Sequence, residues 1–185
     1  MGRFSKISEN TFNELQVEAG VILKTFDPKS PALTDGAIVC ATTGGINPVC
    51  TPEFTDWGED IDNCPNNTME LKRISRYECT LGFTALSVTE ETIKLALGAA
   101  AKDSSGAIKP SMDLKVSDFS DIWWVGDLSN GGFAAVCLKN ALSTGGLSLT
   151  TTKNGKGQIA VTLTGHYSID AQDDVPMEFY IGSAD

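Results

Sequence analysis

The chain is poor in the groups that catalysis and nucleic-acid binding require. It contains one histidine, His166, and its 14 basic residues are outnumbered by 24 acidic ones, which gives a formal net charge of −10. A net-negative surface repels phosphate, so this composition argues against a protein that grips DNA. A hydrolase would depend on His166, which lies in a regular strand pattern, and no helix start follows a cysteine to activate its thiol. We therefore do not expect an enzyme.

Signatures of metal and cofactor sites are also missing. The five cysteines are an odd number and include no Cys-x-x-Cys pair, which argues against a zinc site and favours reduced thiols in a cytoplasmic protein. Neither Gly-x-x-x-x-Gly-Lys-Ser/Thr nor Gly-x-Gly-x-x-Gly occurs. The acidic run at 56–63 could attract a cation, but it lacks the ligand order of an EF-hand, so a solvated loop is favoured. We expect no cofactor and no metal.

Long apolar segments are absent as well. No run approaches the roughly 18 apolar residues that a membrane span needs. Residues 1–10 are polar and lack the apolar core of a signal peptide. We expect no membrane partner and a protein that stays in the cytoplasm where it is made, unless lysis releases it.

What the sequence does contain is strand patterning. From Ile159 to Ile169 the large apolar residues share one parity, and His166 lies on the other, polar parity. Further apolar or alternating segments occur at 15–23, 37–43, 69–83, 119–125, 133–138, 147–152 and 177–181. One helix is expected at about 89–101, with Thr89 as N-cap and with Ile93, Leu97 and Ala100 on its inner face.

These patterns predict a mainly β fold of about eight strands, a β-sandwich or part-open barrel with one flanking α-helix. Residues 1–12 are expected to form an N-terminal arm, residues 13–182 a single β domain, and residues 183–185 a short tail. The three glycine pairs, such as Gly44-Gly45, are expected to be turns or bends.

A long loop is predicted at 46–67, where three prolines accompany the acidic run. Apolar residues that a disordered segment would not need still punctuate it, so we expect it to dock on its own body or on a neighbour: Val49, Phe54, Trp57 and Ile61. In the next strand, the apolar pattern breaks at Arg73 and Ser75, which predicts a bulge near 73–75. The basic residues Lys72, Arg73 and Arg76 cluster there.

Two segments resemble a known family. The stretch AIVCATTGGINPVCTPEFTDWGEDIDNCPNNTMELKRI is similar to the second strand, long loop and third strand of phage and prophage major tail (tail tube) proteins. The closing KGQIAVTLTGHYSIDAQDDVPMEFYI is similar to that family's ending, a Thr-Gly-His-Tyr strand, an acidic turn and a last strand led by Val-Pro. The resemblance covers most of residues 14–182 in order and length.

The resemblance implies a structural subunit that assembles into hexameric rings, which stack into a tube that conducts phage DNA into the host. It implies a place in the virion tail after assembly in the bacterial cytoplasm. Its partners would be further copies of itself and the tail terminator, tape measure and distal tail proteins, and DNA would pass without specific binding.

The same resemblance suggests roles for particular residues. The loop at 46–67 would reach the adjacent ring through Val49, Phe54, Trp57 and Ile61. Lys72, Arg73 and Arg76 would pair with acidic residues of a neighbouring subunit, and the candidates for lining the lumen are Thr162, Thr164, His166 and Ser168. The alternative function is a β-sandwich binding module for carbohydrate or a host surface, with Trp57, Trp123 or Trp124 as its platform.

Overall fold

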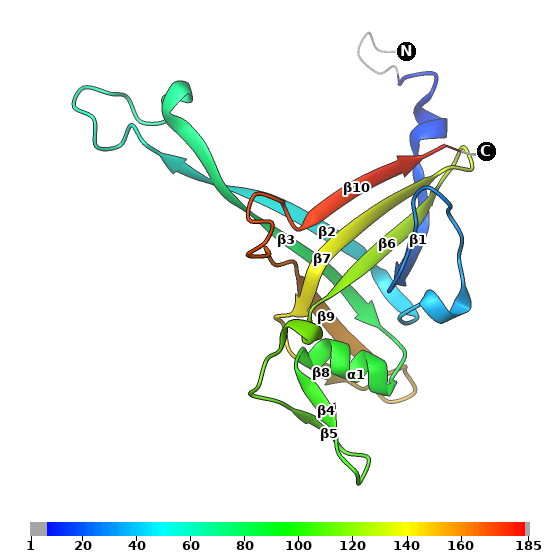
Figure 1. The fold of residues 1–185 in the computed structure, drawn as a ribbon. Coiled ribbons are helices and arrows are strands. Elements are labelled where there is room, and N and C mark those ends of the chain that lie inside the picture. Colours follow the sequence, from blue (N-terminus) through cyan, green and yellow to red (C-terminus); the bar gives the residue numbers. More distant parts are fainter. Residues whose placement is uncertain (1–6, 184–185) are drawn as a thin grey trace.

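The computed structural model describes residues 7–183 and is mainly β, as the sequence predicts (Figure 1). The longer strands are β1 (Gln16–Leu23), β2 (Thr42–Asp56), β3 (Lys72–Ala85), β6 (Ser120–Leu128), β7 (Phe133–Ser143), β9 (Gln158–Thr164) and β10 (Met177–Gly182). Three short strands, β4 (Ala100–Lys102), β5 (Ile108–Pro110) and β8 (Ser148–Thr150), and the helix α1 (Glu90–Leu97) complete the fold together with four single 3₁₀ turns.

Eight strands form one antiparallel sheet in the order β1-β6-β7-β9-β3-β2, with β10 beside β7 and β8 beside β9. Strand β7 belongs to both halves, because residues up to Ala141 pair with β6 and β10 while Leu142 and Ser143 pair with β9. The two halves face each other and share one core cluster, to which β6 and β7 contribute Ile122 and Leu138 and β3 and β9 contribute Leu81 and Leu163. The arrangement is a sandwich that remains open and does not close into a barrel.

Helix α1 covers one end of this sandwich and is shorter than predicted. Thr89 is the N-cap, as expected, and its Oγ1 accepts a hydrogen bond from Thr92 N–H (3.2 Å). The helix stops at Leu97 because Gly98 adopts a positive φ of 76° and the following residues form the β4–β5 hairpin. The predicted inner face is wrong: the buried residues are Thr92 and Ala96, whose small side chains let the helix lie close to β7.

The strand predicted to run to Ile169 ends at Thr164. A side chain at Gly165 would lie 2.8 Å from Leu138 Cδ1 and 2.9 Å from the Pro176 carbonyl oxygen, so the backbone passes here through a space that only glycine fits. Beyond it the chain leaves the sheet, and Tyr167 and Ile169 are exposed rather than buried. The segment predicted as a strand at 37–43 is likewise a 3₁₀ turn at Asp35–Ala37 followed by a single bridge at Ile38, and β2 begins only at Thr42.

The largest correction concerns the predicted loop at 46–67. Residues up to Asp56 belong to β2, which pairs with the whole length of β3 and leaves only 57–71 as the connection. Two irregularities in this ladder match the sequence. The register shifts between Thr43 and Ile46, where Gly44 and Gly45 both have positive φ, and again opposite Ser75, where the bulge was predicted.

Candidate assembly surfaces

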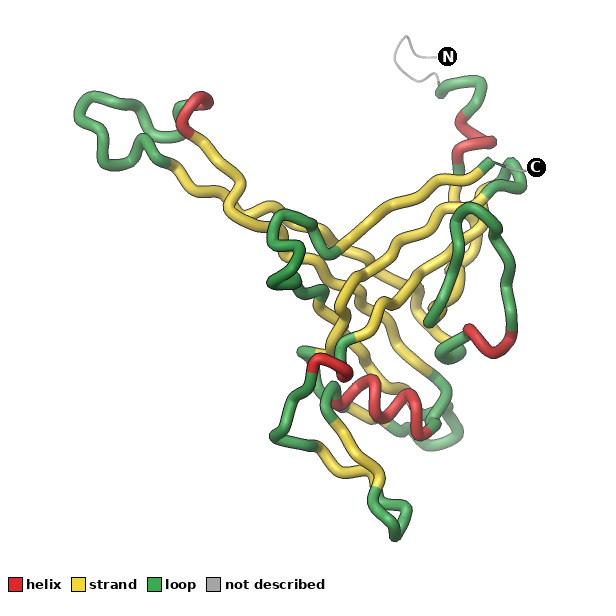
Figure 2. Tube along the Cα trace, viewed as in Figure 1, coloured by secondary structure: helices red, strands yellow, loops and turns green. Residues whose placement is uncertain are grey.

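The β2–β3 hairpin projects from the sandwich as a two-stranded arm (Figure 2). We define the arm as residues 51–78, because Cys79 is the first residue of β3 to be fully buried and the strand residues before it are exposed or half-buried. Along the arm no third strand pairs with β2 or β3 among residues 7–183. A two-stranded ribbon without a packed face is only marginally stable by itself, so this shape favours a partner that covers it.

The apolar residues predicted for contacts lie on or beside this arm. Val49, Phe54, Trp57 and Ile61 are all exposed, and they therefore do not dock on the chain's own body. Met69 and Ile74 add two further exposed apolar side chains that the sequence analysis did not single out. An apolar surface of this kind on a protruding element is typical of an interaction site.

The basic residues on the arm have partners within the chain. Arg76 forms a two-pronged pair with Glu53 on the neighbouring strand, with nitrogen–oxygen distances of 2.8 and 2.9 Å. The hydrogen bond from Arg76 holds the pKa of Glu53 below its usual value. Lys72 Nζ donates to Asn67 Oδ1 (2.9 Å) and lies 5.0 Å from the centroid of the Phe54 ring. An additional pairing of these residues with a neighbouring subunit stays a prediction.

Arg73 contacts the arm in a different way. Its guanidinium donates to the Glu70 carbonyl oxygen (2.9 Å) and lies 5.8 Å from the centroid of the Trp57 ring. One side of Trp57 is therefore occupied. The other tryptophans are half-buried: Trp123 packs on Phe26 and Tyr180, and Trp124 Nε1 donates to the Ala19 carbonyl oxygen (2.9 Å). Of the three platforms considered for a binding module, only Trp57 is exposed.

The arm's connection is held by Asp56. Its Oδ1 accepts from Gly58 N–H (2.9 Å) and its Oδ2 from Asn67 N–H (2.7 Å), and these two bonds, with Asn67 first, lower the pKa of the carboxyl group. Asp56 therefore organises the turn and is not a free ligand. No three His, Cys, Asp or Glu side chains converge as a metal site would need in the described part of the chain.

The open margins of the sheet differ in how readily they could accept another strand. The edge strand β2 is a poor acceptor because of its prolines. Cys79 and Tyr77 turn their backbone groups toward β9 and Tyr167, since the Cys79 carbonyl accepts from Gly165 N–H and Tyr77 N–H donates to Tyr167 Oη. Their partners in β2, Cys50 and Pro52, therefore point their backbone groups to the open edge. Pro52 has no N–H to offer there, and neither has Pro48, which lies four pairs from Pro52 in the same alternation.

Two other margins are also protected. Strand β1 shifts register between Val17 and Val21, and its C-terminal part is covered where Val39 N–H donates to the Ile22 carbonyl (2.9 Å). Strand β8 has three residues. Bulges, prolines and short strands are common means by which proteins keep sheet edges from pairing.

Strand β10 carries no such protection. Lys139 N–H donates to the Pro176 carbonyl (3.0 Å), so Pro176 points its backbone carbonyl to β7. Every second residue of an antiparallel strand points the same way, and Glu178 and Tyr180 therefore also direct their backbone groups to β7. Phe179 and Ile181 consequently point theirs to the open edge, where no strand lies among residues 7–183. Their side chains are 61% and 84% exposed. This margin has unpaired backbone groups next to apolar side chains.

The residues proposed to line a lumen separate into two groups. Thr162 and Thr164 are in β9 opposite Gly82 and Thr80, on a sheet face that also carries Thr84. His166 and Ser168 lie beyond the end of β9, so the expectation that all four share one strand face is wrong. His166 Nδ1 is 3.1 Å from the Asn140 carbonyl oxygen, and its ring packs edge-on against Phe119.

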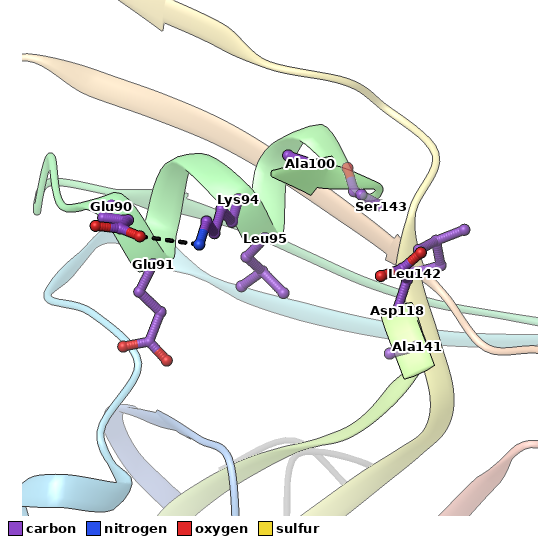
Figure 3. A pocket seen from close by; sticks show the side chains of 10 residues that line it. Glu90, Glu91, Lys94, Leu95, Ala100, Asp118, Ala141, Leu142 and Ser143 are labelled. Carbon is purple, nitrogen blue, oxygen red and sulfur yellow. Dashed lines mark ion pairs between the residues drawn. The ribbon is translucent and has the colours of Figure 1, made fainter. Parts of the chain in front are cut away.

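A pocket beside α1 gathers charged residues (Figure 3). Lys102 and Lys94 both bind Glu90 and lower its pKa to about 2, while Glu91 pairs with Lys24 (2.6 Å). Ser143 Oγ donates to the Ala96 carbonyl oxygen (2.7 Å). Each polar group in this pocket is thus engaged structurally, and none forms a nucleophile next to a free base.

Comparison with models of known protein families and with curated proteins returned no match for this chain. The only α-helix within residues 7–183 has eight residues, so none there is long enough to cross a membrane.

Proposed function

We propose that this chain is the tail tube subunit of a tailed phage or prophage. Copies associate side by side into hexameric rings, and the rings stack into the conduit through which DNA is ejected. Tail terminator, tape measure and distal tail proteins are its further partners, and the virion tail is its location.

The observation that carries this proposal is the unprotected edge at β10. An exposed regular strand with apolar side chains is an aggregation hazard in a solitary protein, which is why natural monomers rarely leave one uncovered. The other margins of the same sheet are protected by prolines, a bulge or shortness. Covering of this edge by another copy of the chain accounts for the contrast with β1, β2 and β8. We infer that the β10 edge meets a different surface of the next copy, because such a head-to-tail contact generates a ring when the rotation between copies closes.

Two further features support the proposal. The arm extends beyond the sandwich with exposed apolar residues, as a subunit that contacts an adjacent ring requires. The face around Thr80, Thr84 and Thr162 carries hydroxyl groups and, in the same alternation, the exposed carboxylate of Glu78, so it would repel a phosphate backbone and would not bind it. Such a face is suited to a channel through which DNA passes.

Negative-stain electron microscopy of the purified protein, together with sedimentation velocity over a range of concentrations, tests the proposal. We expect rings or tubes of uniform diameter, and sedimentation coefficients that increase with concentration. A species that stays strictly monomeric at high concentration would refute it. Binding of such a monomer to carbohydrate, abolished by Trp57→Ala, would instead favour the binding-module function.

A further inference from the structure

Two of the five thiols lie opposite each other at the root of the arm. Cys50 in β2 and Cys79 in β3 are partners in register, and their Sγ atoms are 3.5 Å apart. Cys79 is fully buried and Cys50 is half-buried, so a small molecule can reach the pair from the Cys50 side.

The backbone around this pair has the geometry that a cross-strand disulfide needs. Because the Cys79 carbonyl accepts from Gly165 N–H (2.9 Å), Cys79 directs its backbone groups to β9, and Cys50 and Cys79 form a non-hydrogen-bonded pair. Such pairs have Cα atoms about 4.5 Å apart. That separation falls in the range of about 4.4–6.8 Å seen across disulfides. Side-chain rotation alone can therefore bring the two sulfur atoms to bonding distance.

We propose that Cys50 and Cys79 form a disulfide bond when the protein meets a peroxide, and that this bond ties β2 to β3 at the root of the arm. The inference concerns the thiols themselves and does not depend on the proposed function. If the chain is part of a virion, release from the host takes it from a reducing cytoplasm to surroundings in which disulfides persist.

The chemistry proceeds in two balanced steps. The Cys50 thiol gives up its proton, and the thiolate attacks one oxygen of hydrogen peroxide. The O–O bond breaks, a sulfenic acid forms, and the leaving hydroxide takes up the released proton to give one water. The Cys79 sulfur then attacks the Cys50 sulfur, the S–O bond breaks, and the thiol proton leaves with the hydroxyl as a second water. Two thiols are oxidised to one disulfide and one peroxide is reduced to two waters. Burial, followed by the contact with Cys50, raises the pKa of Cys79 to about 12, so Cys50 reacts first.

The other thiols are placed differently. Cys40 and Cys137 are buried, and burial raises the pKa of Cys137 to about 12 and that of Cys40 to about 11. Cys64 lies in the arm's connection, where its Sγ contacts Thr68 Oγ1 (3.4 Å). Cys64 is half-buried like Cys50 but has no neighbouring thiol within contact distance, which makes it the matched control.

The test treats the purified full chain with hydrogen peroxide and compares it with protein kept in reductant. We expect two of the five thiols to disappear on titration in denaturant, the intact mass to fall by two hydrogen atoms, and one cross-linked peptide to contain both Cys50 and Cys79. Cys50→Ser should abolish the cross-link, whereas Cys64→Ser should leave it unchanged. Peptide mapping of the wild-type chain decides the outcome even if Cys50→Ser fails to fold.

Three results would overturn the inference. They are retention of all thiols after treatment, oxidation of Cys50 to sulfinic acid without cross-linking, and a disulfide that uses any other cysteine. None of them bears on whether the chain forms rings or tubes, so failure here is distinguishable from failure of the proposed function.

Discussion

Ile181→Lys should prevent self-association while leaving the fold intact. Ile181 lies at the open edge of β10 and its side chain is 84% exposed, so the substitution removes almost no internal contact. Exposed substitutions of this kind usually change the free energy of unfolding by no more than about 0.5 kcal/mol. The thermal midpoint of the variant should therefore stay close to that of the wild-type chain.

The effect on association should be much larger. Full burial of an isoleucine side chain contributes about 1.5–3 kcal/mol, and most of that surface is still available at Ile181 for a second copy to cover. A lysine at this position loses the free energy that burial of the isoleucine would contribute, and its ammonium group must also stay in water. A loss of at least about 1.4 kcal/mol weakens each contact roughly tenfold, and a ring repeats the contact at every subunit.

The assay is sedimentation velocity with thermal denaturation of the same samples. Ile169→Lys is the matched control, because Ile169 is 83% exposed and lies in the turn after β9, outside the strands of the sheet. We expect Ile181→Lys to sediment as a monomer and Ile169→Lys to assemble like the wild type. Normal assembly of Ile181→Lys, or equal loss in both variants, would contradict the role assigned to β10.

The backbone of the same edge gives a second comparison. Ile181→Pro removes an N–H that points to the open edge, whereas Tyr180→Pro removes one that β10 directs to β7. We expect the first variant to fold but not to associate, and the second to be destabilised.

Three further predictions concern the sandwich and the arm. Gly20→Ala should destabilise the fold by at least about 1–3 kcal/mol in urea denaturation, because Gly20 has a φ of 72° and its Cβ would lie 2.4 Å from the Val125 carbonyl oxygen; a neutral effect would mean that the bulge in β1 can relax. Leu163→Ala should cost about 2–5 kcal/mol, since Leu163 is fully buried in the core shared by both halves of the sheet; a cost below about 1 kcal/mol would show that the halves are not packed as described. The pKa of the Asp56 carboxyl is lower in the folded chain than its unfolded value of about 3.9. Its contribution to stability is therefore complete above about pH 3.9 and is lost as pH falls through the folded pKa. Hydrogen exchange should therefore show that the Gly58 and Asn67 amides lose protection below about pH 4, and Asp56→Asn should weaken that protection at neutral pH; protection that is unchanged in Asp56→Asn would be evidence against this role.

Features that depend on neighbours along the chain were predictable. The Thr89 cap follows from one hydroxyl next to the start of a helical pattern, and the structure confirms it. The bulge near Ser75 and the bend at Gly44-Gly45 follow from a break in alternation and from glycine's tolerance of positive φ. The predominance of strands and the single helix follow from hydrophobic periodicity.

The candidate assembly surfaces could not be located from the sequence alone. The segment 46–56 was predicted as a loop because Pro48 and Pro52 normally interrupt strands. They are tolerated in β2 because the register with β3 points their backbone nitrogens to the open edge, where no ladder bond is lost. Strand β10 was predicted correctly as a strand, but its exposure was not predictable. The alternation of Met177, Phe179 and Ile181 indicates one buried face, yet only Met177 lies beneath the other half of the sheet.

The sequence by itself determined the class of structure, the capped helix, the irregular points of the long ladder and the shortage of catalytic groups, because these properties depend on residue types and on short-range spacing. Tertiary structure decided which apolar residues are covered, which sheet margins are protected, and that Cys50 lies opposite Cys79. These depend on strand order and register, which join residues far apart in the chain and leave no signal in either segment alone.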